Sequence, residues 1–366
     1  MFKDLSDLLI LNKAFYANPV ALKYIMSHYS SLEALKADSE NLLQQFRLSK
    51  KKYINDSLFH YDPKQDSDYL KKENIKLLSF QESNYPSRLL EISDAPPILF
   101  YKGNIACLKK DSIAIIGPRK ATDYGKTVAK QFTKALARHF CICSGFAKGI
   151  DYIAHKTTCD QNKETIAVLG AGFATVYPTH YHSLSKDILN NNGLILTEVP
   201  LFAPSLPFHF RHRNRIISGL SKGVLICEAA TKSGTLVTAQ CALDQNRENF
   251  SVPGSIFSNE SEGTLSLIQQ GAKCTLKPKD IYDELNIFYP EDNSLFDQEP
   301  VQPALESNLS ETEHIIVDIL KTPHNIDDVV SASKLPLSQV LHSITMLELK
   351  NVITQKPGKL FHINAA

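Results

Sequence analysis

From about residue 85 the sequence repeats one unit, in which a short apolar run ends in a glycine or polar turn and a helical stretch follows. Six strand-like runs occur in this part of the chain, at residues 112–116, 140–143, 165–169, 194–197, 223–227 and 249–252. Strands that alternate with helices pair in parallel, and continuously apolar strands indicate a sheet covered on both faces. The repeat therefore predicts an α/β fold with a doubly wound, mostly parallel sheet. In such sheets ligands bind outside the carboxyl ends of the strands.

The segments on either side of this repeat differ from it in composition. Residues 1–80 are rich in Leu and Lys with helical spacing and little Gly, which predicts a small helical domain of the SAM or helix–hairpin–helix kind. The predicted sheet domain covers residues 81–286. Residues 287–309 are predicted to form an acidic linker, because they contain five acids, three prolines and no Lys or Arg.

Residues 310–366 predict a winged-helix-like domain, since three helical segments precede a hairpin signal. Ser310 and Glu313 have the spacing of a capping box at the first helix. The third helix, near 336–350, is expected to have one apolar stripe, formed by Leu337, Val340, Leu341, Ile344 and Leu347. Its other positions are mostly Ser, Thr and Glu, so both DNA reading and a protein contact remain open for this domain.

The overall charge is balanced, with 40 Lys and Arg against 39 Asp and Glu, for a formal net charge of +1. A polyanionic partner would therefore have to bind a local basic patch. No apolar run reaches about 18 residues, and Leu8–Leu11 is too short for a signal peptide, so we expect a cytoplasmic chain without a membrane span. The seven Cys are irregularly spaced, which predicts reduced thiols and no metal site.

Two glycine motifs come close to cofactor-binding patterns without completing them. Gly125-Lys126-Thr127 ends like a phosphate-binding P-loop, but Lys120 stands where that loop needs its first glycine. Gly170-Ala171-Gly172 is half of a dinucleotide fingerprint and lacks the third glycine and the later acid. No Ser or Cys lies in a nucleophile-elbow pattern. The sequence thus predicts neither a cofactor nor a catalytic residue, and Asp151 with His155 is interpreted as a contact on a helix surface.

Two glycine turns at the ends of neighbouring predicted strands could bind phosphate groups. Each places small residues before a helix, where backbone N–H groups and the positive end of the helix dipole attract an anion, and each contains one cation. The alternative is that the glycines only make tight turns and that Lys148 is a solvated charge. The candidate residues are Gly117 and Arg119 in the first turn, and Ser144, Gly145, Phe146, Ala147, Lys148, Gly149 and Asp151 in the second.

A third basic element runs from residue 210 to residue 215, and its candidate ligands for DNA are Arg213, Asn214 and Arg215. Arginine can grip phosphate or stack on a base, and Phe208 and Phe210 offer aromatic faces nearby. The alternative is that an arginine pairs internally with Glu198 or Glu228, at the ends of two strands. Ser233 and Gly234 stand at the start of another predicted helix. They could form a further anion site there, or they could serve only as a helix cap.

These residues resemble the DNA-processing protein A (DprA/Smf) family of bacterial natural transformation. The resemblance covers most of the chain and keeps the family's order. The matching segments are Tyr85-Pro86, Pro96–Gly103, Ala114–Arg119, Tyr124-Gly125, Ser144–Asp151, Ala154-His155, Thr165–Gly170, Tyr177-Pro178, Arg213–Ile217, Ser233–Leu236, Thr238-Ala239, Val252–Gly254 and Gly271-Ala272.

The resemblance implies a non-enzymatic protein with a Rossmann-like sheet domain that binds single-stranded DNA without sequence preference. It also implies a homodimer formed through that domain, and loading of the RecA recombinase onto incoming strands displaced from single-strand-binding protein. The family's DNA-contacting cations correspond to Arg119 and Lys148. Two departures concern the candidate site: Pro118 stands where the family usually has Ser, and Arg211 stands where a proline is common.

Two other functions remain as alternatives at this point. One is a nucleotide-cleaving enzyme that uses a strand-end carboxylate such as Glu228. The other is a scaffold that acts through its terminal domains.

Overall fold

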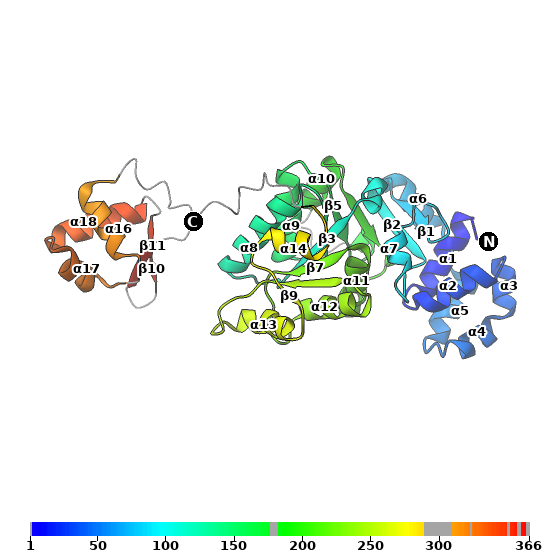
Figure 1. Cartoon of the computed structure of the whole chain (residues 1–366). Helices are drawn as coiled ribbons and strands as arrows, with labels where there is room; N and C mark the ends of the chain where they lie inside the picture. The colour runs from blue at the N-terminus through cyan, green and yellow to red at the C-terminus, as the bar shows by residue number, and fades with distance from the viewer. Residues whose placement is uncertain are drawn as a thin grey trace. The chain divides into compact units, whose positions relative to one another are not determined.

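A computed structural model describes residues 2–175, 182–288, 309–322, 324–349, 352–356 and 360–363 of the chain (Figure 1). The chain forms two compact units, residues 1–290 and 291–366, which are described separately below. The predicted acidic linker lies almost entirely outside the described residues, so it stays a prediction.

Residues 2–75, all of which are described, fold into helices around an apolar core that is continuous with the first strands of the sheet. Among the largest fully buried side chains of this core are those of Phe15, Leu22 and Ile25. Asn18 starts the second helix, where its side chain accepts a hydrogen bond from the backbone N–H of Ala21. The predicted helical N-terminal region is therefore confirmed. Its helices are α1 (Leu5–Phe15), α2 (Pro19–His28), α3 (Leu32–Ala37), α4 (Ser39–Gln45), α5 (Lys51–His60) and α6 (Lys64–Glu73).

The rest of the larger unit is built on a nine-stranded sheet in the order β1-β2-β6-β5-β4-β3-β7-β8-β9. The pairs from β6 across to β9 are parallel, whereas β2 is antiparallel to both β1 and β6. All six predicted runs are strands of this sheet, which confirms the predicted mostly parallel α/β fold. The strands are β1 (Lys76–Ser79), β2 (Ile98–Gly103), β3 (Ser112–Ile116), β4 (Cys141–Ser144), β5 (Thr165–Val168), β6 (Leu194–Thr197), β7 (Gly223–Ile226), β8 (Glu248–Ser251) and β9 (Lys273–Cys274).

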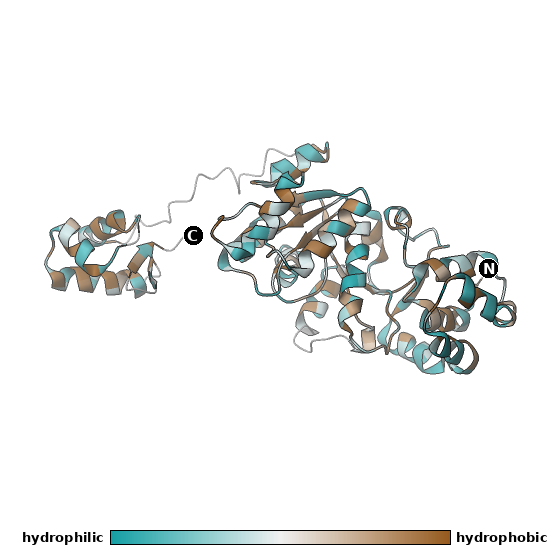
Figure 2. Ribbon diagram, turned by 90° about the horizontal axis from the view of Figure 1, so that it is seen from below, coloured by the Kyte–Doolittle hydropathy of each residue, from teal (hydrophilic) through white to brown (hydrophobic). Residues whose placement is uncertain are grey.

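Helices cover both faces of the sheet, and Figure 2 shows hydrophobic strands between more hydrophilic helices. One face packs on α7, α11 and α12 through residues such as Leu89, Ile217 and Ala239. The other packs on α9 and α10 through Cys159 and Leu184, which explains why the central strands are apolar throughout. The helices are α7 (Ser87–Leu90), α8 (Asp123–Leu136), α9 (Ile150–Asp160), α10 (His182–Asn190), α11 (Pro207–Leu220), α12 (Gly234–Asp244), α13 (Glu262–Gln269) and α14 (Pro278–Glu284), with short 3-10 turns η1 (Ile105–Lys109), η2 (Phe173–Thr175) and η4 (Asn259–Ser261).

The edge strand β1 lies inside the segment, residues 1–80, that the sequence predicts as helical. Its residues Leu77 and Leu78 pair with Phe100 and Leu99 of β2. A four-residue strand with one charged end has too little alternation to be distinguished from a helix end by periodicity alone.

The smaller unit contains α16 (Glu311–Ile319), α17 (Ile326–Ser333) and α18 (Leu337–Leu349), followed by the antiparallel strands β10 (Ile353–Lys356) and β11 (Leu360–Ile363). The capping box of Ser310 and Glu313 is present at α16. The order of three helices and a hairpin confirms the predicted winged-helix domain.

The predicted apolar stripe of α18 is only partly buried. Val340, Ile344 and Leu347 enter the core of the smaller unit, but Leu337 and Leu341 are 52% and 42% exposed. The last two positions lie on the flank of the buried face, because each residue turns an α-helix by about 100°.

Phe250, which is fully buried in β8, provides a test of the sheet core. We expect Phe250→Ala to lower the free energy of unfolding of the larger unit by about 3–5 kcal/mol, through lost burial and the cavity that remains. Phe59→Ala is the matched control, because Phe59 is 47% exposed, and it should cost less than about 1 kcal/mol. Urea titrations followed by circular dichroism measure both; equal losses would contradict the assigned core.

Candidate nucleic-acid interface

The strand order reverses beside β3, which fixes where the sheet can hold a ligand. From β3 the chain continues through β4, β5 and β6 on one side, and then returns to place β7, β8 and β9 on the other. Loops that leave β3 and β7 diverge to opposite faces, so a crevice opens outside the carboxyl ends of these strands. The predicted turns at residues 117–119, 144–149 and 233–234 all follow strands β3, β4 or β7.

The turns after β3 and β4 are in direct contact. The backbone N–H of Ile150 donates to the carbonyl of Pro118 at 3.4 Å. Gly149 has a φ of +80°, and a Cβ on it would lie 2.2 Å from the Pro118 carbonyl oxygen. Only glycine allows both the backbone conformation and this approach. As a result, Arg119 and Lys148, which are both exposed, belong to adjoining segments.

Arg119 also meets an aromatic ring of α11. Its guanidinium carbon lies 5.2 Å from the ring centroid of the half-buried Phe210, within the range of a cation–π contact. Phe210 in turn packs against Gly170 at the end of β5, where a Cβ would lie 2.8 Å from the ring. The first predicted cation is therefore held over a ring that is itself fixed to the sheet.

A cleft of about 610 Å³ lies at this edge of the sheet, between the turns after β3, β4 and β7 and one face of α11. Arg119, Arg211 and Arg213 line it, and Asp151 is the carboxylate among its lining residues. The cleft is therefore rich in positive charge although the chain is nearly neutral. Gly117, Ala147, Asn214, Ser233 and Gly234, which are among the predicted DNA ligands, also line it.

Arg213 is an interior group rather than an exposed phosphate ligand. It is 4% exposed, and its Nη1 donates to the carbonyls of Gly145 and Val168, at the ends of β4 and β5. Burial lowers the pKa of Arg213 to about 10, which leaves it protonated near neutral pH. The predicted direct DNA contact is corrected accordingly, since the guanidinium supports the second turn from beneath.

Arg215 is likewise buried, so its predicted contact with DNA is also corrected. Its guanidinium pairs with Glu198 at 2.5 Å and with Asp94 at 3.2 Å. The alternative prediction, that an arginine pairs internally with Glu198, is therefore correct for Arg215. Burial raises the pKa of Glu198 to about 7, and the nearby Arg215 opposes that rise.

Most of the second turn also faces inward. The Ser144 hydroxyl donates to the Ile115 carbonyl at 2.7 Å, and Phe146 is buried against the core beneath α10. Asp151 is buried too, accepts a hydrogen bond from the Ala147 N–H at 3.4 Å, and has its pKa raised by burial. Ser144, Gly145, Phe146 and Asp151 therefore shape the turn, while Lys148 reaches solvent.

The interpretation of Asp151 and His155 as a helix-surface pair is wrong. His155 is fully buried, and its Nδ1 lies 2.8 Å from the Thr165 hydroxyl. The face of α9 that carries Asp151 and His155 packs toward the sheet, so their i, i+4 spacing belongs to a buried helix face.

At the third turn, the Ser233 side chain accepts a hydrogen bond from the Thr235 N–H at 3.1 Å and caps α12. The helix-cap role is therefore present, and the exposed Gly234 remains open for an anion. Glu228, on which the enzyme alternative depends, accepts hydrogen bonds from the backbone and hydroxyl of Thr122 at the start of α8.

Sequence reasoning left some cleft residues out of the predicted set, notably Pro207 and Arg211. Together with Phe210 and Asn214 they occupy positions i, i+3, i+4 and i+7 of α11, which share one helix face. Helical periodicity could therefore have found them.

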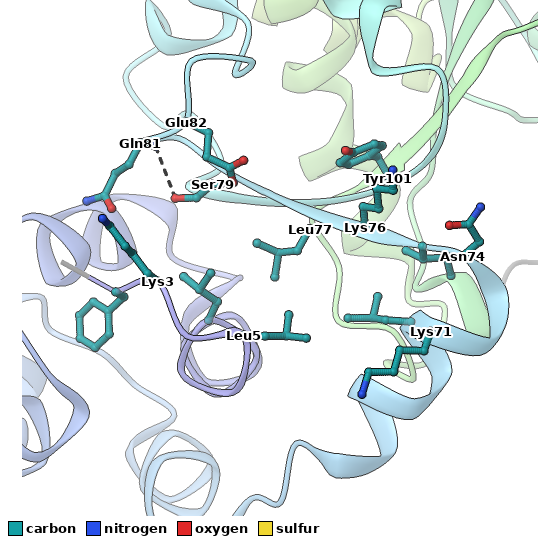
Figure 3. A pocket seen from close by; sticks show the side chains of 14 residues that line it. Lys3, Leu5, Lys71, Asn74, Lys76, Leu77, Ser79, Gln81, Glu82 and Tyr101 are labelled. Atoms are coloured by element: carbon teal, nitrogen blue, oxygen red, sulfur yellow. Dashed lines mark hydrogen bonds between the residues drawn. The ribbon is translucent and has the colours of Figure 1, made fainter.

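A second cavity, of about 680 Å³, lies between α1, α6 and β1 (Figure 3). Leu5, Leu8 and Leu77 contribute apolar lining, and Lys3, Lys71 and Lys76 also surround it. None of the predicted DNA ligands is among its lining residues. Within the described ranges, no group of His, Cys, Asp and Glu is arranged to hold a metal ion, and no helix is long and apolar enough to cross a membrane.

Comparison with known proteins decides the family. The family model described as DNA recombination-mediator protein A matches residues 76–286, and the DprA winged helix domain matches residues 299–359. The chain belongs to the DNA recombination-mediator protein A family. This confirms the family that the sequence motifs resembled.

Relatives of this family resemble the chain over most of its length. Protein Smf of Escherichia coli K12 is 37% identical over 309 residues, which cover 81% of this chain and 80% of that protein. The crystal structure of DNA processing protein A from Streptococcus pneumoniae is 32% identical, with a TM-score of 0.66, over 78% of this chain and 99% of that one. A Helicobacter pylori structure that addresses single-stranded DNA binding by its own DNA processing protein A is 30% identical, with a TM-score of 0.52, over 58% of this chain and 95% of that one.

The buried His155 makes stability depend on pH. Burial lowers its pKa to about 3, whereas an unfolded histidine has a pKa of about 6.5, so below that pH the unfolded state binds the proton and the folded state does not. The contribution of His155 to the free energy of unfolding should fall by about 2 kcal/mol between pH 7 and pH 5.

Urea titrations at both pH values measure this effect. Between pH 7 and pH 5, the free energy of unfolding of His155→Asn should decrease less than that of wild type. Replacing the exposed His60 by Asn should leave the wild-type pH dependence in place. An unchanged pH dependence in His155→Asn would contradict the assignment.

Proposed function

We propose that this protein binds single-stranded DNA without sequence preference, along the cleft and the adjoining turns at residues 117–119 and 144–149. The observation that carries the proposal is the contact at Gly149, which brings the segments of Arg119 and Lys148 together at the reversal point of the sheet. Family membership and the DNA-binding relative from Helicobacter pylori support the same ligand.

The available groups suit a nucleic-acid backbone better than a base edge. Arg119, Lys148 and Arg211 are exposed cations, and the positive end of the α9 dipole lies just after the second turn, where it favours an anion. Phe210 offers an aromatic face, on which any base can stack. Contacts of these kinds position a strand without reading its sequence.

We propose further that the protein acts in the cytoplasm as a mediator that loads RecA onto incoming DNA during natural transformation, displacing single-strand-binding protein. Membership of the recombination-mediator family supports this role. We also propose a homodimer through the Rossmann-like domain. Ile256 and Phe257 follow β8 and Leu276 follows the neighbouring β9. They are 75%, 92% and 69% exposed, and exposed apolar side chains that gather at one end of a sheet favour self-association.

The two exposed cations provide the test of DNA binding. We expect Arg119→Ala/Lys148→Ala to weaken binding of oligo-dT by at least about tenfold. The slope of log affinity against log salt should become shallower by roughly 1.4, because two phosphate contacts on a single strand release about 0.7 ions each. Fluorescence anisotropy at several salt concentrations measures both quantities.

Lys109→Ala/Lys163→Ala is the matched control, because both lysines are exposed and precede the amino ends of β3 and β5, at the opposite edge of the sheet. The control should bind like wild type. A cleft variant that binds as tightly as the control would overturn the proposed site.

For the dimer, Phe257→Glu/Leu276→Glu should convert the protein to a monomer in analytical ultracentrifugation, because buried carboxylates are costly in an apolar interface. Val20→Glu, at a position 50% exposed on α2, should leave the assembly unchanged. A dimer that survives the double substitution would place the interface elsewhere.

A further inference from the structure

The helical N-terminal region has a basic segment that the proposed site does not include. Arg47, Lys50, Lys51 and Lys52 are all exposed, and residues 44–55 contain no acid. Asp56, one turn after Lys52 on α5, is the next carboxylate along the chain. We call residues 47–52 the basic segment. If it lies close to the cleft it can contact the same ligand, and otherwise it is only a solvated surface.

The basic segment lies against the start of α11. The Lys50 ammonium nitrogen is 5.8 Å from the ring centroid of Phe208. The adjacent His209 has its pKa lowered, first by burial and then by the charge of Lys50. Phe208 itself remains 40% exposed, so its ring still offers a face to solvent.

Contacts from α1 hold this arrangement in place. The Tyr16 hydroxyl lies 3.0 Å from Nε2 of His209. The Asn12 side-chain amide donates to the Glu198 carbonyl at 3.0 Å, and this hydrogen bond is buried. The helical region is thus tied to the end of β6 and to α11 by polar contacts that fix its orientation.

Phe208 connects the basic segment with the cleft along the chain. Its neighbour Pro207 lines the cleft, as do Phe210 and Arg211. Phe208 therefore lies in the first turn of α11, within three residues of the cleft-lining Phe210 and Arg211, and beside Lys50. A groove that combines cations with aromatic faces is what proteins use to bind single strands without sequence preference.

We propose that the DNA path continues from the cleft across Phe208 onto Lys50, Lys51 and Lys52, so that the helical region is a second DNA-contacting part of the protein. This inference rests on the proposed function and extends it from a local site to a longer track. It predicts that the length of the oligonucleotide determines whether the helical region contributes.

The experiment compares binding of an oligo-dT length ladder by the full chain and its variants. Lys50→Ala/Lys51→Ala/Lys52→Ala should bind the shortest bound lengths like wild type and the long ones about tenfold more weakly. For long oligonucleotides its salt slope should also be shallower, by roughly 0.7 for each phosphate that the variant no longer binds.

A second variant separates stacking from charge. Phe208→Ala should weaken long oligo-dT about tenfold, because a base loses its stacking partner, with an unchanged salt slope because no cation is removed. The charge-matched control is Lys3→Ala/Lys71→Ala/Lys76→Ala, which removes three exposed lysines around the cavity in Figure 3; it should bind every length like wild type.

The outcomes distinguish this inference from the proposed function. If the basic-segment variant binds long oligo-dT like the control, or loses affinity equally at all lengths, the extended path is overturned while the cleft stands. If wild type binds no oligo-dT of any length, the proposed function fails, and the extended path fails with it. Circular dichroism spectra that match wild type establish that the variants are folded.

Discussion

The turns after β3 and β4 can meet only because Gly149 has no side chain. A Cβ at this position would lie 2.2 Å from the Pro118 oxygen, closer than two such atoms can approach, and the backbone there adopts a φ that other residues avoid. Separating the turns would pull the segments of Arg119 and Lys148 apart. The absence of a side chain at one residue thus determines whether the segments of the two cations adjoin.

The interior of the second turn depends on a buried charge in a similar way. Arg213 bonds the carbonyls of Gly145 and Val168, two acceptors that the parallel ladder leaves at the ends of β4 and β5. Buried carbonyls need donors, and a guanidinium supplies several from one side chain. The same residue adds positive charge beneath the cleft, so one arginine contributes both to the folding of the turn and to the potential above it.

Much of the fold could be predicted from sequence, because a parallel sheet covered on both faces leaves continuous apolar runs such as Ile113–Ile116. The turn glycines and the capping box of Ser310 could also be predicted, because each depends only on residues that are close together in the sequence. Local patterns could not decide whether Arg213 and Arg215 are buried, although the sequence did offer Glu198 as an alternative internal partner. Their partners, among them Gly145 and Asp94, lie far away in the sequence, and a basic run on an amphipathic helix looks the same whether its cations face solvent or the core.

The helix α11 has two faces with different tasks, since Phe210, Arg211 and Asn214 line the cleft while Arg215 pairs with Glu198 off that face. Each residue advances an α-helix by about 100°. Inserting or deleting one residue early in this helix would therefore rotate the cleft residues away and break the buried ion pair in one event. Point substitutions can alter either face separately, but changes in length cannot, so α11 should be among the segments least tolerant of insertions and deletions.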